Sequence, residues 1–151
     1  MGLRPGVALA LAAGCALAPA ARADCFDEAA AYQHVNPAVL RAIAWQESHG
    51  RGDALHRNAN GSLDYGIMQI NSIHQSELRR WGIAAEQLMQ PCVSVYVAAW
   101  HLRKMMLKYG NNWDAVGAYH SETPALRDSY KEAIRRIVAA HGGEGGDGAD
   151  K

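Results

Sequence analysis

The stretch that decides the fold runs from Glu47 to Ser72 and reads ESHGRGDALHRNANGSLDYGIMQINS. Its first residue, Glu47, ends an apolar helical pattern, and the rest is rich in glycines and side-chain amides, which favour turns. A second carboxylate, Asp64, lies within this turn-rich part. An acid in an apolar setting opposite a second carboxylate is suited to cleaving a glycosidic bond. We therefore take Glu47 and Asp64 as the candidate catalytic pair.

The helix before Glu47 places this acid among apolar side chains. Asn36 and Pro37 form a helix start, with asparagine as the cap and proline in the first turn. An apolar stripe at helical spacing follows, and Glu47 lies on it, four residues after Ile43. Burial and the helix C-terminus both disfavour a negative charge, so they favour the protonated form that a general acid needs. The alternative is a solvated surface glutamate.

Outside this stretch the pattern predicts helices almost throughout. Helices are expected over residues 25–34, 36–50, 72–81, 84–90, 93–109, 112–118 and 123–140. Residues 52–72 are expected to be irregular, with a small distorted hairpin around Asn60 and Gly61. The fold class is therefore mainly α, in one domain over residues 24–140. Residues 141–151 are Gly- and Asp-rich without an apolar anchor, which predicts a disordered tail.

Residues 1–23 are predicted to be a cleaved signal peptide. Arg4 precedes an uncharged Ala- and Leu-rich run over residues 6–18, and Ala21-Arg22-Ala23 has small residues at the two positions that a signal peptidase reads. The apolar run is shorter than the roughly 20 residues of a membrane-spanning helix. Cleavage is expected before Asp24, which makes the protein periplasmic. The alternatives are an uncleaved anchor and lipidation at Cys15.

Cysteine count and charge exclude some function classes. Loss of the leader removes Cys15 and leaves Cys25 and Cys92, an even pair that predicts one disulfide in an exported protein; two free thiols are the alternative. Neither cysteine has a second ligand at metal-binding spacing, so no metal or cofactor is predicted. The whole chain has a net charge of +0 and all its acids lie beyond the leader. A nucleic-acid partner is not expected, because it would require a basic face.

Three motifs together resemble a known family. Glu47-Ser48, the segment Gly66-Ile67-Met68-Gln69-Ile70 and the pair Ala118-Tyr119 are similar to the lytic transglycosylase SLT domain of the lysozyme-like superfamily. The size, the leader and the run from Tyr119 to Pro124 are most similar to the small exported enzymes that accompany type III and type IV secretion systems. The resemblance covers nearly all of residues 25–140 and implies a lysozyme-like α+β domain.

A second resemblance overlaps the first. The segment from Asn60 to Ser72 is similar to the active-site strands of c-type lysozymes, with Glu47 as the acid and Asp64 as the second carboxylate. Lysozyme is itself the standard example of such a divided pair. Many lytic transglycosylases lack an acid at the position of Asp64, so this site resembles a hybrid of the two families. The alternative for Asp64 is a turn acid that bonds local backbone amides.

The two resemblances imply different products from one substrate, peptidoglycan. A lytic transglycosylase cleaves the β-1,4 bond between N-acetylmuramic acid and N-acetylglucosamine and leaves a 1,6-anhydro ring. A muramidase uses Glu47 and Asp64 to complete hydrolysis with water. Resemblance along the whole chain favours the first. A non-catalytic glycan-binding module is the rival from a different class, and the presence of both acids argues against it.

The main resemblance also assigns substrate contacts. It implies that Ser48 holds the substrate acetamido group or Glu47, and that the hydroxyl of Tyr119 approaches Glu47. The further candidates for substrate binding are Met68, Gln69, Asn71 and His120. His120 departs from the family, which usually has asparagine there. The four tryptophans (Trp45, Trp81, Trp100 and Trp113) are expected in the core. We expect a monomer that opens the cell wall for a secretion system.

Overall fold

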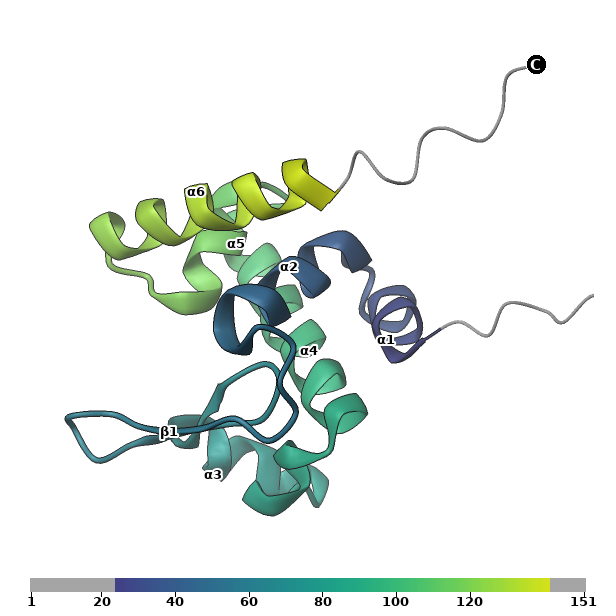
Figure 1. Ribbon diagram of the computed structural model, residues 1–151, viewed down its shortest axis with the longest axis vertical. Helices are drawn as coiled ribbons and strands as arrows, with labels where there is room; N and C mark the ends of the chain where they lie inside the picture. The colour runs from purple at the N-terminus through teal and green to yellow at the C-terminus, as the bar shows by residue number, and fades with distance from the viewer. Residues whose placement is uncertain (1–23, 142–151) are drawn as a thin grey trace, which may run out of the picture.

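The long helix α4 runs through the middle of the molecule, and the other elements pack around it (Figure 1). The computed structural model describes residues 24–141. The α-helices are α1 Cys25–Gln33, α2 Pro37–Ser48, α3 Gln75–Leu78, α4 Pro91–Tyr109, α5 Trp113–His120 and α6 Pro124–His141. Three short 3-10 helices are η1 Ser72–His74, η2 Arg79–Trp81 and η3 Ala85–Met89. The prediction of a mainly α fold is confirmed.

The predicted hairpin segment is a small antiparallel sheet of three strands. Its strands are β1 Leu55–Arg57, β2 Leu63–Tyr65 and β3 Ile70–Asn71, in the order β1-β2-β3. Asp64 in the central strand pairs with His56 on one side and with Asn71 on the other. The sheet extends away from the helices at the level of α3 (Figure 1). It therefore forms a separate wall opposite the helical part.

The core lies where α2, α4 and α6 meet the segment that follows β2. Its largest fully buried side chains include Leu40, Ile43, Met68, Leu102 and Ile134. Burying a side chain of this size contributes about 1.5–3 kcal/mol. Leu40 and Ile43 belong to the apolar stripe that predicted α2, so packing of this stripe fixes the direction in which the end of α2 points.

A disulfide between Cys25 and Cys92 joins the first turns of α1 and α4, with their Cα atoms 5.4 Å apart. The predicted pairing is therefore confirmed. The bridge closes a loop that contains α2 and the whole sheet, because the two cysteines are 67 residues apart. Both carboxylates of the candidate pair lie inside this loop, and the cross-link limits how far its ends can separate.

The start of α2 also agrees with its prediction. The side chain of Asn36 accepts a hydrogen bond from the backbone N–H of Ala38 at 2.8 Å, and Pro37 is the first helical residue. Within residues 24–141, no helix is long and apolar enough to cross a membrane. The predicted signal peptide and Cys15 lie outside the described residues, as does the predicted tail apart from His141, which ends α6.

Candidate active site

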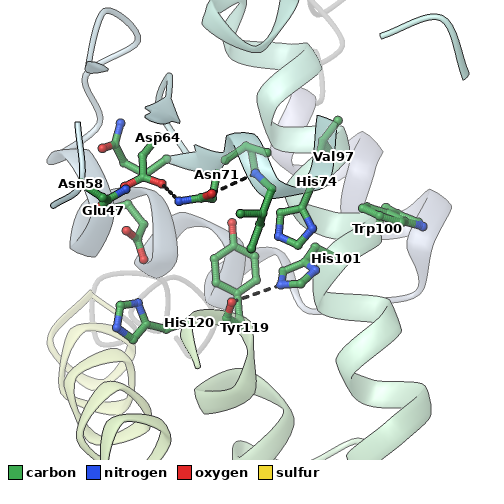
Figure 2. Close-up of a pocket in the computed structure, with 13 residues that line it drawn as sticks. Glu47, Asn58, Asp64, Asn71, His74, Val97, Trp100, His101, Tyr119 and His120 are labelled. Atoms are coloured by element: carbon green, nitrogen blue, oxygen red, sulfur yellow. Dashed lines mark hydrogen bonds between the residues drawn. The ribbon is translucent and has the colours of Figure 1, made fainter. Parts of the chain in front are cut away.

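Glu47 lies in the last turn of α2, with its carboxyl group partly buried at the end of a cleft (Figure 2). The hydroxyl of Tyr130, on α6, donates a hydrogen bond to Glu47 Oε1 at 2.5 Å. Burial raises the pKa of Glu47, the nearby charge of Asp64 raises it further, and the Tyr130 hydrogen bond acts in the opposite direction. The net shift is upward, which favours the protonated acid as predicted.

Asp64 faces the cleft from β2 and is held by side-chain amides. Asn58 Nδ2 donates to Asp64 Oδ2 at 2.8 Å, and Asn71 Nδ2 donates to Asp64 Oδ1 at 2.6 Å. The Ser62 hydroxyl oxygen accepts from both amides, at 3.1 Å each. Carboxylate oxygens are hydrogen-bond acceptors, and each oxygen of Asp64 has an amide donor here. The predicted role of Asn71 as a direct sugar ligand therefore competes with its contact to Asp64.

The cleft between these two residues has a volume of about 240 Å³ and continues toward α4. Figure 2 shows Glu47 and Asp64 at one end, Tyr119 in the middle and Trp100 at the opposite end. Polar and apolar groups both line it, as expected for a saccharide that presents hydroxyls and C–H faces. The cleft thus lies between two walls. We call α2, α4, α5 and α6 the helical wall and the three strands the sheet wall; Glu47 belongs to the first and Asp64 to the second.

Ser48 connects the two walls and is itself buried, with 7% of its surface exposed. Its Oγ lies 2.8 Å from the carbonyl oxygen of Ile67 and 3.2 Å from that of Ala44. The hydroxyl therefore joins the last turn of α2 to the segment after β2. This placement lets Ser48 position Glu47 relative to the sheet. Its hydroxyl is bonded to the backbone and is not directed at a sugar.

The turn that starts at Gly66 carries the next two candidates. Gly66 has φ +72°, and a Cβ there would lie 2.1 Å from the carbonyl oxygen of Leu88, so only glycine fits. Met68 follows with its side chain fully buried, and it offers the cleft no side-chain surface. Gln69 lines the cleft, but its amide nitrogen donates to the carbonyl oxygens of Ala54 and Gly66 at 3.2 and 3.0 Å. Gln69 thus braces the backbone of this turn.

Two tyrosines approach the catalytic end, in an arrangement that differs from the prediction. The hydroxyl of Tyr119 donates to the carbonyl oxygen of Met68 at 3.2 Å, whereas Tyr130 donates to Glu47. Burial and the charge of Glu47 raise the pKa of both hydroxyls well above the ordinary value, so both are protonated donors. The sequence did contain a signal for Tyr130, because it lies four residues before Ile134 on the apolar face of α6, and a buried tyrosine hydroxyl needs a partner.

His120 is exposed at the edge of the site, where its ring stacks on that of Tyr130 with centroids 4.8 Å apart. It lines the cleft together with Glu47. Sequence reasoning missed a second histidine, His101 on α4, which also lines the cleft. Its Nε2 lies 3.1 Å from the carbonyl oxygen of Tyr119, and burial lowers its pKa to about 4. His101 is therefore neutral at neutral pH, with Nε2–H as the donor to this carbonyl.

The described residues contain no group of three or more His, Cys, Asp or Glu side chains placed to hold a metal ion. The side chains that line the cleft supply acid–base and electrostatic chemistry. A glutamic acid with a raised pKa opposite an aspartate held by amides is the pattern of a glycosidase, in which environment divides the roles of two carboxylates.

Comparison with known families agrees with this geometry. The family described as the transglycosylase SLT domain matches residues 24–137, which include every candidate site residue. The chain belongs to the transglycosylase SLT domain family. It is accordingly an enzyme of the lytic transglycosylase class, and the substrate class of an SLT domain is peptidoglycan, which lies outside the cytoplasm.

Similar proteins come from several enteric bacteria. The chain is 47% identical to protein IpgF of Shigella flexneri over 103 residues, which are 68% of each chain. It is 43% identical to invasion protein IagB of Salmonella typhimurium (strain SL1344) over 117 residues, which are 77% of this chain and 73% of the relative. It is 38% identical to X polypeptide of Escherichia coli (strain K12) over 118 residues, 78% of this chain and 68% of the relative.

Proposed function

We propose that this enzyme cleaves the β-1,4 bond between N-acetylmuramic acid and N-acetylglucosamine and releases a 1,6-anhydromuramic product. The observation that carries the proposal is a partly buried Glu47 with a raised pKa at the end of a cleft, in a chain whose SLT match spans residues 24–137. Such an enzyme needs one group that first gives a proton and then takes one. Glu47 can perform both steps.

In the first step, Glu47 gives its proton to the glycosidic oxygen, and the bond from that oxygen to C1 of the muramic residue breaks. The N-acetylglucosamine side leaves as an alcohol, and positive charge develops at C1. In the second step, the C6 hydroxyl of the same muramic residue attacks C1 and gives its proton to the Glu47 carboxylate. The new C6–O–C1 bond closes the anhydro ring and restores the acid, without consuming water.

Asp64 stabilises the positive charge at C1, alone or together with the acetamido carbonyl of the substrate. Asn58 and Asn71 each donate to a different oxygen of its carboxylate, at 2.8 and 2.6 Å, which fixes the carboxylate before substrate arrives. A preorganised charge of this kind costs no reorganisation during the reaction. In this proposal Asn71 acts through Asp64.

Most of the remaining candidates are positioning residues, and one is assigned a contact with the sugar. Ser48 and Gln69 hold the backbone of the turn between β2 and β3, and Met68 belongs to this turn. Tyr119 supports the same backbone from α5 through its hydrogen bond to Met68. His120 is exposed at the edge of the cleft, and we assign it a contact with the substrate.

Mass spectrometry of the released muropeptides tests the product. Purified peptidoglycan is digested with the wild-type protein and, as a control, with Glu47→Gln. Anhydro products lack one water relative to hydrolysis products, so the expected mass is lower by one water per cleavage. Products that carry the extra water would overturn the anhydro assignment.

Hydrolysis by a muramidase mechanism is the second candidate, and one observation favours it. Asp64 is held by two amides opposite a glutamic acid with a raised pKa, which is the division of roles in lysozyme. In that mechanism water, instead of the C6 hydroxyl, attacks C1. The same mass measurement decides between the two products, because both candidates require Glu47.

We further propose that the enzyme is an exported monomer that opens the cell wall for a secretion system. The similarity to invasion protein IagB and the resemblance to secretion-associated enzymes support this role. In the source organism, deletion of the gene is expected to reduce secretion, and the wild-type protein is expected to restore it. Restoration by Glu47→Gln would contradict a role that depends on cleavage. Light scattering on the purified protein tests the monomer.

A further inference from the structure

A second groove lies beside the catalytic cleft and is lined mainly by aromatic and aliphatic side chains. Its volume is about 650 Å³, more than twice that of the cleft. We call it the aromatic groove and define it by Tyr32 and Gln33 from α1, Trp81, Ile83 and Gln87 from the segment of η2 and η3, and Cys92, Val93, Tyr96, Val97 and Trp100 from α4. None of these residues takes part in the chemistry proposed above.

Several aromatic rings of this groove face solvent, although tryptophans were expected in the core. Tyr32 is 73% exposed and Trp81 is 53% exposed. Trp81 stands edge-on to Trp100 with ring centroids 4.8 Å apart, and Tyr32 lies 6.3 Å from Tyr96. Exposed aromatic faces that are clustered in this way mark a binding surface rather than a packing requirement.

The groove and the cleft share two residues, Val97 and Trp100. Both lie on α4, one turn apart, and Trp100 stands at the end of the cleft opposite Glu47 (Figure 2). The cleft and the groove are therefore adjacent, with Val97 and Trp100 lining both of them.

We infer that the aromatic groove binds the same glycan strand at sugars remote from the cleaved bond; this inference rests on the proposed function. The substrate is a polymer, whereas the cleft has a volume of only about 240 Å³, so most of a bound strand must lie on the surface outside it. Aromatic rings stack against the C–H faces of sugars. Gln33 and Gln87 supply amides for the acetamido groups, and Gln87 uses its oxygen to cap Ala84, which leaves its nitrogen as a donor.

Strand length provides the test, because a short substrate fills the cleft but does not reach the groove. Binding is measured by calorimetry in the Glu47→Gln background, so that no strand is cleaved during the titration. The probes are a peptidoglycan tetrasaccharide and strands several times longer. Two groove variants, Trp81→Ala and Tyr32→Ala, are compared with two matched controls outside the groove, Trp45→Ala and Leu107→Ala. The controls are chosen for similar exposure, 48% for Trp45 and 73% for Leu107.

The expected result is a loss of about five- to tenfold in affinity for the long strands in each groove variant. Affinity for the tetrasaccharide is expected to be unchanged, and the control variants are expected to bind both probes as the parent does. Equal losses for both probes, or no loss for either, would overturn the inference; a surface for a protein partner would give the second result.

This experiment separates the inference from the proposed function. Binding is read without turnover, so a strand-length effect can be seen even if the product assignment is wrong. If the wild-type protein gives no cleavage while long strands still bind through Trp81 and Tyr32, the proposed function fails and the groove remains a glycan site. If cleavage occurs and the groove variants bind as the controls do, only the groove assignment fails.

Discussion

Glu47 and Asp64 carry the same functional group, but the helical wall and the sheet wall surround it differently. The helical wall partly buries Glu47, and this burial raises its pKa more than the hydrogen bond from Tyr130 lowers it. The sheet wall gives Asp64 two amide donors on its two oxygens. The first environment favours the protonated form of the acid, and the second holds both carboxylate oxygens in place. Two walls of different composition thus give one functional group two roles.

The largest effect is expected from Glu47→Gln. Glutamine keeps the shape of the side chain and its contact with Tyr130, but it can neither give nor take the proton. We expect the rate of glycan cleavage to fall by about a thousandfold or more, since general acid–base catalysis contributes roughly 10²–10⁴-fold and Glu47 serves in both steps. Clearing of peptidoglycan in a zymogram measures the loss. Clearing equal to that of the wild type would remove Glu47 from the mechanism.

A smaller loss is expected from Asp64→Asn, about a hundredfold, which is typical for removal of one preorganised electrostatic contact. The variant removes the part of the upward pKa shift of Glu47 that comes from the charge of Asp64, whereas the larger part, which comes from burial, remains. The pKa of Glu47 therefore falls. The alkaline limb of the pH–rate profile, where Glu47 loses its proton, should move to lower pH. A loss as large as that of Glu47→Gln would instead favour the nucleophile role.

Local signals made much of the fold predictable from the sequence. The helix that carries Glu47 was readable from its asparagine cap and apolar stripe, and both reappear in α2. The disulfide followed from the pair of cysteines that lies beyond the predicted signal peptide. Each of these features depends on neighbouring residues or on simple counting. The sheet was predicted only as an irregular hairpin, because its third strand has just two residues, Ile70 and Asn71.

The contacts that complete the site were less predictable, because they join distant parts of the chain. Tyr130 and Glu47 are 83 residues apart, and the family resemblance directed attention to Tyr119 instead. The prediction that all tryptophans lie in the core was wrong for Trp45 and Trp81, which are 48% and 53% exposed. Composition does not reveal which aromatic residues a tertiary arrangement leaves on the surface.

Ser48→Ala tests whether the two walls must be held together. The variant removes the hydrogen bond that the Ser48 hydroxyl donates to the Ile67 carbonyl. Such a bond contributes about 1 kcal/mol to the free energy of unfolding, and a buried group that loses its partner can cost up to about 3 kcal/mol. We expect a lower free energy of unfolding in urea and a fall of about tenfold in kcat, because Glu47 is less well placed. Ser48→Thr, which restores a hydroxyl, serves as the rescue variant. Unchanged kcat in Ser48→Ala would show that the walls stay aligned without this contact.

Tyr130→Phe produces the smallest expected effect and the sharpest test of the comparison between the walls. Phenylalanine keeps the packing and the stacked ring next to His120, but it removes the hydrogen bond that opposes the upward shift of the Glu47 pKa. The pKa of Glu47 should therefore rise, and the alkaline limb of the pH–rate profile should move to higher pH. The rate at acid pH should change only a few-fold, since the proton donor itself remains.

Asp64→Asn moves the same limb in the opposite direction, so the two variants measured side by side separate the influence of the helical wall on Glu47 from that of the sheet. Shifts of the same sign in both variants would mean that the two walls do not act on Glu47 independently.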